Sequence, residues 1–381
     1  MENNELKIIS ELKRCIGCKV SPCATNCPVG VSPTNFIALA LKGDYEEAAS
    51  LIRSKNPLAE TCGHICPDTF CQKKCIRQKI DFPIHIPYLQ ASITQKIPQK
   101  QLELPKYNGK HIAIVGGGPS ALGACWQLIQ YGYKVSIFEK ENQLGGALRL
   151  IPDYRLPKSI LDKEISYITD NDRTTVHLNH EIKDFSALKN NYEDVILALG
   201  EQTPHKLGAQ GEELAVPYKT ILSSPSTYKT KKVCIVGGGE VALDCALTLK
   251  KHGSQIVEMF VRRRQTDMRI MQRDFKELED RGIVIRELTS VTSIKKAENN
   301  TLCLETIHNT ITENNKASPI PNTNQTLKDY DLVVTALGST CKQDNITSFH
   351  QIGDMTGLCG TAVEALASGI KLAKSIHKTQ G

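Results

Sequence analysis

The sequence is poor in aromatic residues and has no long hydrophobic run. Aromatic side chains make up 5% of the 381 residues, and there is one tryptophan. The longest apolar stretches fall far short of the ~20 residues that a membrane-spanning helix needs, and Gly, Lys or Asp interrupts them. Residues 1–10 lack the apolar segment of a signal peptide. We therefore expect a globular chain of two or three domains, located in the cytoplasm.

A strong excess of one charge is also missing. The chain has 47 basic and 41 acidic residues, which give a formal net charge of +6. This mild balance is not typical of nucleic-acid-binding proteins. A disulfide framework does not fit either, because such frameworks belong to small secreted domains. The 14 cysteines are therefore expected to ligate metal or to remain free thiols.

Eight of the cysteines form two tight groups near the start of the chain. The spacings are CxxCxxxxCxxxC for Cys15, Cys18, Cys23 and Cys27, and CxxxCxxxxCxxxC for Cys62, Cys66, Cys71 and Cys75. Structural zinc usually takes two cysteine pairs per ion, whereas each group has four cysteines in quick succession. Cys27 and Cys66 each precede a proline, as the ligand run of bacterial ferredoxins does. The pattern favours iron–sulfur clusters, with zinc as the alternative.

The other six cysteines are scattered and include no CxxC pair. They are Cys125, Cys234, Cys245, Cys303, Cys341 and Cys359. A dithiol mechanism is therefore not expected.

The chain changes character after about residue 105. The Cys-rich part before it has helical stretches at 35–42 and 45–53 and no clear strand, and residues 98–110 resemble a linker. A strand, a Gly-rich turn, a helix and a second strand then follow from 111 to 139. The same pattern recurs from 232 to 264. The turns are Gly116-Gly117-Gly118-Pro119-Ser120-Ala121 and Gly237-Gly238-Gly239-Glu240-Val241-Ala242.

Both turns are dinucleotide-binding fingerprints in the context that such fingerprints require. The first glycine permits the tight turn, the second lets a pyrophosphate approach the backbone, and the helix N-terminus supplies N–H donors. Two copies in one chain favour two nucleotide sites over structural glycine turns. The first unit ends at Glu139, a ribose acceptor. The second ends at Arg262, Arg263 and Arg264, which suit the 2′-phosphate of NADPH, although a solvated basic turn is the alternative.

Further segments predict that one nucleotide domain is inserted into the other. Two apolar strands, 195–200 and 332–338, both end in Ala-Leu-Gly and bracket the second unit. Near the C-terminus, Gly353 and Asp354 precede a helix expected at 361–376. The layout is that of a flavoprotein in which Asp354 meets FAD and the final helix points its positive end at the flavin.

The chain resembles the small subunit of glutamate synthase and, more closely, the NAD(P)H-oxidising part of dihydropyrimidine dehydrogenase. The resemblance covers residues 11–380. The segments that carry it are 14–18, 23–28, 56–67, 83–90, 145–146 and 151–157. It implies an α/β protein with an all-α iron–sulfur domain followed by two nested Rossmann-like domains of the glutathione reductase type.

The resemblance also implies two [4Fe–4S] clusters with ligands exchanged between the cysteine groups. One cluster would use Cys15, Cys18, Cys23 and Cys75, and the other Cys27, Cys66, Cys71 and Gln90. Cys62 would be a free thiol. Gln90 is an ordinary helix residue by spacing, and only the resemblance makes it a ligand.

The expected domains are 1–105 for the clusters, 106–202 with 339–381 for FAD, and 203–338 for NADPH. The expected FAD residues are Gly116, Gly118, Pro119, Ser120, Ala121, Glu139, Lys140, Gly145, Gly146, Arg155, Gly200, Gly353, Asp354, Thr361 and Ala362. The expected NADPH residues are Gly237, Gly239, Glu240, Val241, Arg262, Arg263, Arg264 and Gly338.

These features predict an oxidoreductase that passes electrons from NADPH through FAD and the clusters to a separate acceptor subunit. The cofactors carry the chemistry, so no catalytic side chain is expected. A redox sensor without turnover and a zinc-stabilised flavoprotein reductase are the alternatives. The segment between Gly338 and Gly353 is shorter than in the family, which leaves the FAD contacts and partner docking there open.

Overall fold

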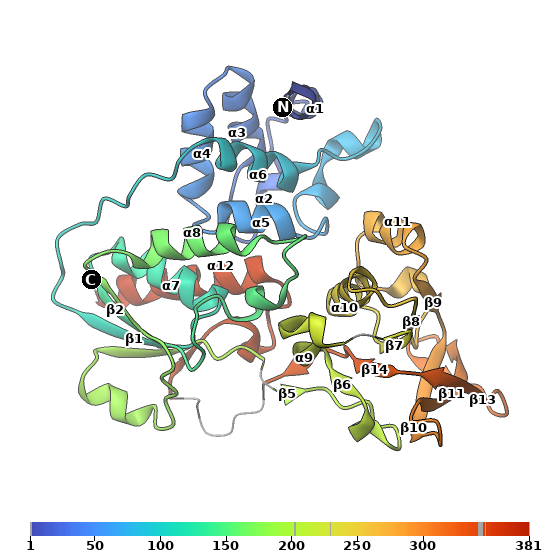
Figure 1. Cartoon of the computed structure of the whole chain (residues 1–381). Helices are drawn as coiled ribbons and strands as arrows, with labels where there is room; N and C mark the ends of the chain where they lie inside the picture. The colour runs from blue at the N-terminus through green and yellow to red at the C-terminus, as the bar shows by residue number, and fades with distance from the viewer. Residues whose placement is uncertain (1, 202, 229, 342–345, 347, 381) are drawn as a thin grey trace. The chain divides into compact units, whose positions relative to one another are not determined.

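The N-terminal part of the chain is helical. The structure, a computed structural model, describes residues 2–201, 203–228, 230–341, 346 and 348–380 (Figure 1). No strand lies in the described residues before 111. The helices there are α1 (Glu2–Lys13), α2 (Pro22–Thr25), α3 (Pro33–Leu41), α4 (Tyr45–Arg53), α5 (Ala59–Ile65) and α6 (Ile86–Lys96), with the 3-10 turns η1 (Gln72–Lys74) and η2 (Ile76–Lys79).

Local sequence explains where several of these helices begin. Pro33 occupies the first turn of α3, where its missing N–H costs nothing, so this helix starts two residues before the expected position. Asp44 caps α4 by accepting the N–H of Glu47 at 3.0 Å. The helices share one apolar core that includes Phe36, Ile52, Leu89 and the thiols of Cys23 and Cys75. The cysteine-bearing turns are therefore part of the core.

The first strand–turn–helix–strand unit begins a parallel sheet with the order β16-β4-β1-β2-β3. Its strands are β1 (His111–Val115), β2 (Lys134–Phe138), β3 (Thr174–His177), β4 (Asp194–Leu197) and β16 (His350–Gln351). Its helices are α7 (Pro119–Ile129), α8 (Lys158–Thr169) and α12 (Ala362–Gln380), with η3 (Gly146–Leu150), η4 (Ser186–Asn190) and η8 (Gly353–Thr356) as 3-10 turns.

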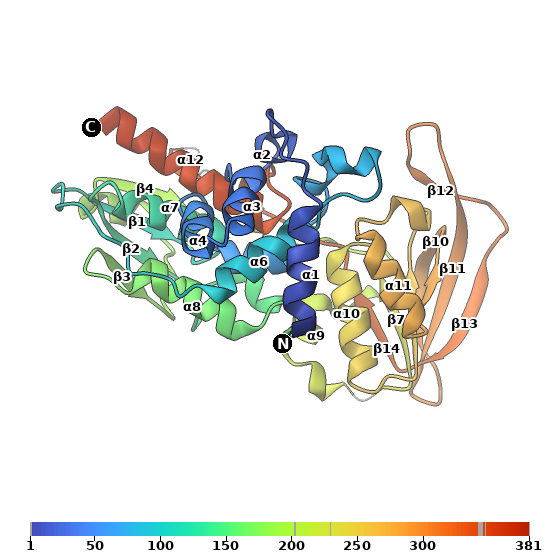
Figure 2. The same ribbon diagram turned by 90° about the horizontal axis from the view of Figure 1, so that it is seen from above.

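Helices α7 and α12 lie side by side because glycines remove side chains at their contact (Figure 2). A Cβ on Gly123 would lie 2.4 Å from the Leu366 carbonyl oxygen. A Cβ on Gly369 would lie 2.0 Å from the Ser120 carbonyl oxygen. The final helix extends to Gln380 rather than ending near 376, since no helix-breaking residue intervenes before Gly381.

The second strand–turn–helix–strand motif belongs to another parallel sheet, with the order β6-β14-β7-β8-β9. Its strands are β6 (Val216–Pro217), β7 (Lys232–Val236), β8 (Ile256–Phe260), β9 (Val284–Arg286) and β14 (Leu332–Thr335), and its helices are α9 (Tyr218–Ser223), α10 (Glu240–Lys251) and α11 (Gln272–Asp280). An antiparallel sheet comprises β10 (Thr289–Lys296), β11 (Leu302–Ile311), β12 (Ala317–Pro319) and β13 (Gln325–Tyr330). Short strands β5 (Thr203–Pro204) and β15 (Ser339–Thr340) pair with each other, and η5 (Glu212–Leu214), η6 (Pro225–Thr227) and η7 (Gln265–Asp267) are 3-10 turns.

The chain divides into two compact units. Unit 2 comprises residues 150–152 and 203–340, and unit 1 comprises the rest. The predicted mixed α/β fold with an N-terminal helical part is confirmed, whereas the domain boundaries stay a prediction. In the part of the chain that the structure describes, no helix is both long and apolar enough to cross a membrane.

Candidate functional site

The structure brings four cysteines of the two sequence groups around one small cavity. Cys15, Cys18, Cys23 and Cys75 all line it. Cys15 follows α1, Cys23 lies in α2, and Cys75 lies between η1 and η2. The turn from Cys15 to Cys18 passes through Gly17, whose φ of +61° disfavours other residues. These four thiols are the set predicted for the first cluster, and soft thiolates suit an iron–sulfur centre.

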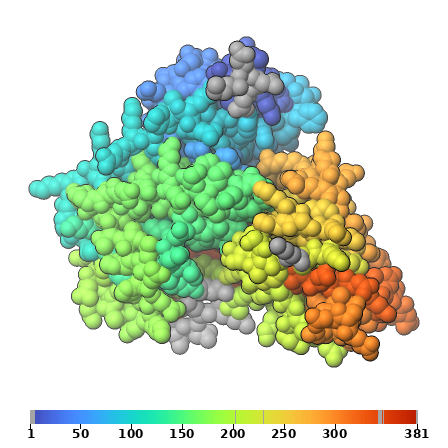
Figure 3. Space-filling model, viewed as in Figure 1, coloured from blue at the N-terminus to red at the C-terminus, as the bar shows by residue number. Residues whose placement is uncertain are grey.

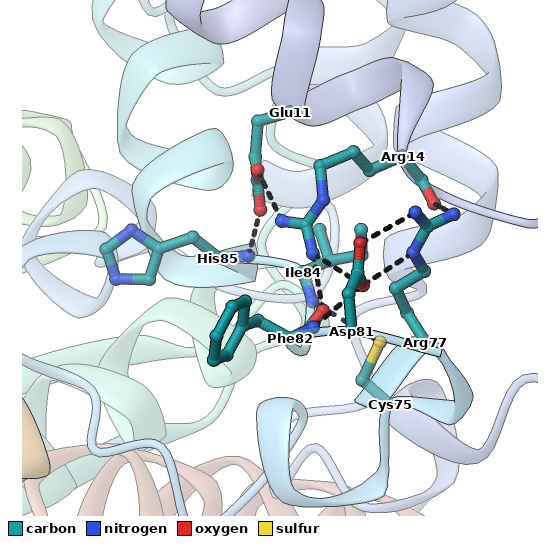
Figure 4. A network of polar contacts seen from close by, with 8 residues as sticks. All are labelled: Glu11, Arg14, Cys75, Arg77, Asp81, Phe82, Ile84 and His85. Atoms are coloured by element: carbon teal, nitrogen blue, oxygen red, sulfur yellow. Dashed lines mark hydrogen bonds and ion pairs between the residues drawn. The ribbon is translucent and has the colours of Figure 1, made fainter. Parts of the chain in front are cut away.

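A network of ion pairs fixes the two segments that meet at this cavity (Figure 4). The guanidinium of Arg14 donates to Glu11 at 2.7 Å and to Asp81 at 3.0 Å. Arg77 donates to both carboxylate oxygens of Asp81 at 2.7 Å. These bonds hold the pKa of Asp81 well below its usual range. The network ties the end of α1 to the loop that carries Cys75.

The remaining cysteines of the two groups form a second set. Cys27, Cys66 and Cys71 are close enough to affect one another electrostatically, and Cys62 forms a sulfur hydrogen bond with Cys66. The amide of Asn26 donates to the Phe70 carbonyl at 2.7 Å, which joins the Cys27 loop to the Cys71 loop. The set therefore contains the three predicted thiolate ligands together with Cys62. Cys62 and Cys66 are four residues apart at the end of α5, a spacing that places two side chains on one face of a helix.

Gln90 is buried in α6 next to α5. Its Nε2 donates to the Ala59 carbonyl at 2.6 Å, which orients the amide. Ala59 lies one turn before Cys62 on α5. The role of Gln90 as a ligand stays a prediction.

Burial raises the pKa of Cys15, Cys23, Cys27 and Cys71, and that of Cys71 is about 12. The pKa of Cys66 is also raised, first by its hydrogen bond with Cys62 and then by burial. Desolvation disfavours a lone thiolate, so iron would have to displace protons when it binds. Within the described ranges, no three or more His, Cys, Asp or Glu side chains are arranged to hold a single metal ion.

The first Gly-rich turn has the space and the donors that a dinucleotide needs. Gly116, with φ +107°, packs so tightly that a Cβ would lie 2.3 Å from the Ala198 carbonyl oxygen. Gly118, by contrast, faces open space, with no heavy atom within 4 Å of a Cβ. Helix α7 starts directly after it with Pro119. Open space in front of a helix N-terminus fits a pyrophosphate.

Glu139 lies beneath this turn and is buried. Its Oε2 accepts the N–H of Gly117 at 2.7 Å, and its Oε1 accepts the N–H of Glu141 at 2.9 Å. Each carboxylate oxygen can accept more than one hydrogen bond. The carboxylate therefore shapes the turn and can still accept a ribose hydroxyl.

Distant segments complete the site around α7. A Cβ on Gly353 would lie 2.6 Å from the Ser120 hydroxyl, and a Cβ on Gly146 would lie 2.9 Å from Gly118 Cα. Asp354 is largely buried, and its Oδ1 has no hydrogen-bond partner within the described part of the chain. Burial raises the pKa of this carboxyl. A buried oxygen without a hydrogen-bond partner fits a polar ligand such as FAD.

The other residues predicted for FAD have less specific surroundings. Thr361 donates from its hydroxyl to Glu364 at 2.8 Å at the start of α12, and Ala362 is the first residue of that helix. Gly200 has φ +66° after β4. Lys140 is exposed and Arg155 is half-buried. Sequence reasoning missed Ser368, whose hydroxyl accepts the Gly353 N–H at 2.9 Å, because a serine within a helix has no distinguishing local signal.

The second Gly-rich turn repeats this geometry within unit 2. A Cβ on Gly237, with φ +149°, would lie 2.3 Å from the Ala336 carbonyl oxygen, whereas Gly239 faces open space. Helix α10 begins at Glu240. In both units the first glycine therefore packs on the alanine of an Ala-Leu-Gly segment. Residues 342–345 and 347 of the short 338–353 segment lie outside the described residues.

The three arginines after β8 differ in their surroundings. Arg264 donates to Asp267 at 3.0 Å and to Asn315 at 3.3 Å, so its guanidinium is already engaged. Arg262 is exposed and Arg263 is half-buried. The N–H of Arg269 donates to the Gly238 carbonyl at 3.1 Å and returns the loop to the glycine turn. The end of the arginine loop therefore lies next to the glycine turn.

Comparison with known proteins agrees with this geometry. Residues 110–356 match the family described as pyridine nucleotide-disulphide oxidoreductase. The chain belongs to this family. Residues 1–102 match dihydropyrimidine dehydrogenase domain II, 4Fe-4S cluster. The protein is therefore an FAD-type NAD(P)H oxidoreductase with an N-terminal 4Fe-4S domain, and the family predicted from the sequence is confirmed.

Two similar proteins are named as a subunit or a small chain of an enzyme. The NAD-dependent dihydropyrimidine dehydrogenase subunit PreT of Salmonella typhimurium is 33% identical over 295 residues, which cover 74% of this chain and 71% of that protein. The glutamate synthase [NADPH] small chain of Azospirillum brasilense is 27% identical over 307 residues, which cover 72% of this chain and 62% of that protein. T. acidophilum thioredoxin reductase shares the fold, with a TM-score of 0.54, 17% identity, and coverage of 71% of this chain and 99% of that one.

Proposed function

We propose that this oxidoreductase takes electrons from NADPH and passes them through FAD and two [4Fe–4S] clusters to a separate acceptor subunit. The observation that supports it most is the convergence of Cys15, Cys18, Cys23 and Cys75 on one cavity, in a chain that also has two open glycine turns. The relatives named above are subunits or small chains, which supports a separate acceptor.

We assign a role in electron transfer to each predicted site. In unit 1, Gly118, Glu139 and Asp354 would hold FAD, which accepts a hydride and can release electrons singly to clusters. The two cysteine sets would hold the clusters, the second with Gln90. In unit 2, the loop of Arg262 and Arg263 would select NADPH, since guanidinium groups suit a 2′-phosphate. The Salmonella relative is NAD-dependent by name, so nucleotide choice is the part that most needs a test.

The test is an anaerobic titration of the purified protein with NADPH and then with NADH. Visible absorption and electron paramagnetic resonance follow the flavin and the iron–sulfur signals, and metal analysis counts iron and zinc. We expect bleaching of both chromophores at lower NADPH than NADH concentration. Zinc without iron would overturn the clusters, and a stronger response to NADH would overturn the nucleotide choice. A single reduction without turnover on an artificial one-electron acceptor would indicate a sensor instead.

A further inference from the structure

Exposed apolar side chains are concentrated around the first cysteine set. Fourteen large hydrophobic side chains are exposed in the described part of the chain, and five of them lie in segments 16–20 and 76–82. These five, here called the apolar patch, are Ile16, Val20, Ile76, Ile80 and Phe82. The side chains of Phe82 and Val20 are 77% and 76% exposed. A cluster of exposed apolar residues is typical of a protein-interaction site.

The two segments form one surface. Arg14 donates to Asp81 at 3.0 Å and Arg77 donates to the Arg14 carbonyl at 3.3 Å, so the loops lie side by side (Figure 4). Ile16 and Ile76 also line the cavity that Cys15, Cys18 and Cys75 surround. Two residues of the apolar patch therefore line the cavity predicted for the first cluster, and the other three lie in the same two segments.

Positive charge surrounds this patch. Segments 13–20 and 73–82 hold seven basic side chains and one carboxylate, that of Asp81, which is paired with two arginines. Removing these residues from the 47 basic and 41 acidic ones leaves equal numbers in the rest of the chain. These two segments therefore carry a net charge of +6, and the carboxylate of Glu11, which accepts a hydrogen bond from Arg14, lies next to them. Figure 3 shows the blue N-terminal segments at the surface.

The lysines of this rim are available to a partner. Lys19, Lys73, Lys74 and Lys79 are exposed, and none takes part in an ion pair within the described residues. An apolar centre with a charged rim is the usual composition of a protein interface. Charge of one sign on the rim steers a partner of the opposite sign.

We propose that the apolar patch and its lysine rim dock an electron-accepting protein whose contact face is acidic around an apolar centre. This inference rests on the proposed function, because it assigns the exit of the same electron path. The Arg14–Asp81–Arg77 network keeps the two loops in register, so the surface is formed before the partner binds and little ordering cost is added on docking.

The experiment uses a pair of acceptors that differ in surface charge. Native cytochrome c is basic, and its succinylated form presents carboxylates around the same haem. Under anaerobic conditions one NADPH reduces two ferric haems and yields NADP⁺, one proton and two ferrous haems. We expect a kcat/KM about tenfold higher for the succinylated form at low salt, with the difference disappearing at high salt.

Variants locate the docking surface. We expect the double variant Lys73→Glu, Lys79→Glu and the variant Phe82→Ala to lower kcat/KM for succinylated cytochrome c about tenfold. Both should also weaken its binding, measured by surface plasmon resonance without NADPH. Turnover with benzoquinone, a small neutral acceptor, and iron content should stay unchanged. The matched controls are Lys42→Glu and Leu6→Ala, two exposed residues of the same helical part outside these segments.

Three results would overturn the proposal. The first is an equal kcat/KM for the two cytochromes, and the second is a set of patch variants that behave like the controls. The third is a dimer, seen by sedimentation, that Phe82→Ala dissociates, because a second copy of the chain would then occupy the patch. Failure of the proposed function is distinguishable, because NADPH would then reduce no iron–sulfur cluster in wild type or in any variant.

Discussion

The carboxylate of Glu164 accepts the backbone N–H of Thr61 at 2.9 Å, and its other oxygen accepts the N–H of Glu60 at 2.6 Å. Glu164 lies on α8 of the flavin-type fold, whereas Thr61 lies in the first turn of α5, the helix that Cys66 directly follows. A buried acid of one fold thus caps a helix that positions the second cysteine set.

The Glu164 cap predicts a specific dependence of stability on pH. Burial raises the pKa of Glu164 to about 7, although the two N–H donors oppose this. Since the folded pKa exceeds the unfolded value, the carboxyl contributes full stability below about pH 4.5 and loses it as the pH rises through about 7. Glu164→Gln removes this dependence. The stability advantage of wild type over Glu164→Gln in urea unfolding should fall by about 1 kcal/mol between about pH 6 and about pH 8.

The control for this prediction is Glu103→Gln, because that carboxylate is exposed. At about pH 6, Glu164→Gln should itself cost about 1–3 kcal/mol, since one buried N–H would face an amide donor. Parallel curves for wild type and Glu164→Gln across this pH range would show that Glu164 does not change its charge there.

Cysteine variants should separate ligands from the neighbouring thiol. Cys75→Ser removes a predicted ligand from the first set and should lower bound iron by about half. Cys62→Ser should leave the iron content unchanged, although Cys62 lies beside Cys66. Iron and sulfide analysis with electron paramagnetic resonance measures both. If Cys62→Ser loses a cluster and Gln90→Leu keeps both, Cys62 rather than Gln90 is the fourth ligand.

The contact between α7 and α12 should not tolerate a methyl group. In Gly369→Ala the new Cβ would lie 2.0 Å from the Ser120 carbonyl oxygen. Alanine favours a helix by about 1 kcal/mol over glycine, but overpacking against backbone costs about 1–3 kcal/mol or more. We expect a lower melting temperature and weaker FAD retention. Gly360→Ala is the control, because its nearest atom would be 4.0 Å away. An unchanged melting temperature for Gly369→Ala would contradict this packing.

The arginine loop should distinguish the two nucleotides. Arg262→Gln and Arg263→Gln should each raise the KM for NADPH about tenfold and leave that for NADH nearly unchanged, because only NADPH has the 2′-phosphate. Arg264→Gln should affect both nucleotides alike, since Arg264 is bound to Asp267 and orders the loop. Steady-state kinetics with both nucleotides measures this. An equal loss for both nucleotides in the first two variants would support the solvated basic turn.

The nucleotide folds could be predicted closely because their signals are local. The two strands expected between residues 111 and 139 are present as β1 and β2, since apolar runs next to glycine turns determine them. The same holds for the glycines: a φ of +107° at Gly116 is a property of one residue and its neighbours. The cysteine spacing likewise predicted metal chemistry before any contact was known.

Contacts between distant segments could not be derived in this way. Spacing left each cysteine group as one possible site, and only the resemblance separated Cys75 from its own group. The fold places Cys75 beside Cys15 and Glu164 beneath Thr61. The apolar patch could not be predicted from the sequence either, because its two segments become neighbours only through Arg14, Arg77 and Asp81.

Neighbouring residues thus determine the helices and strands, the glycine turns and the kind of metal ligand. Backbone sterics, hydrophobic periodicity and thiolate chemistry all act over a few positions of the chain. The grouping of the thiols, the cap on α5 and the concentration of positive charge around one cavity depend on the packing of segments far apart in the chain. Packing energies are shared among many side chains, so no single stretch of sequence specifies these contacts.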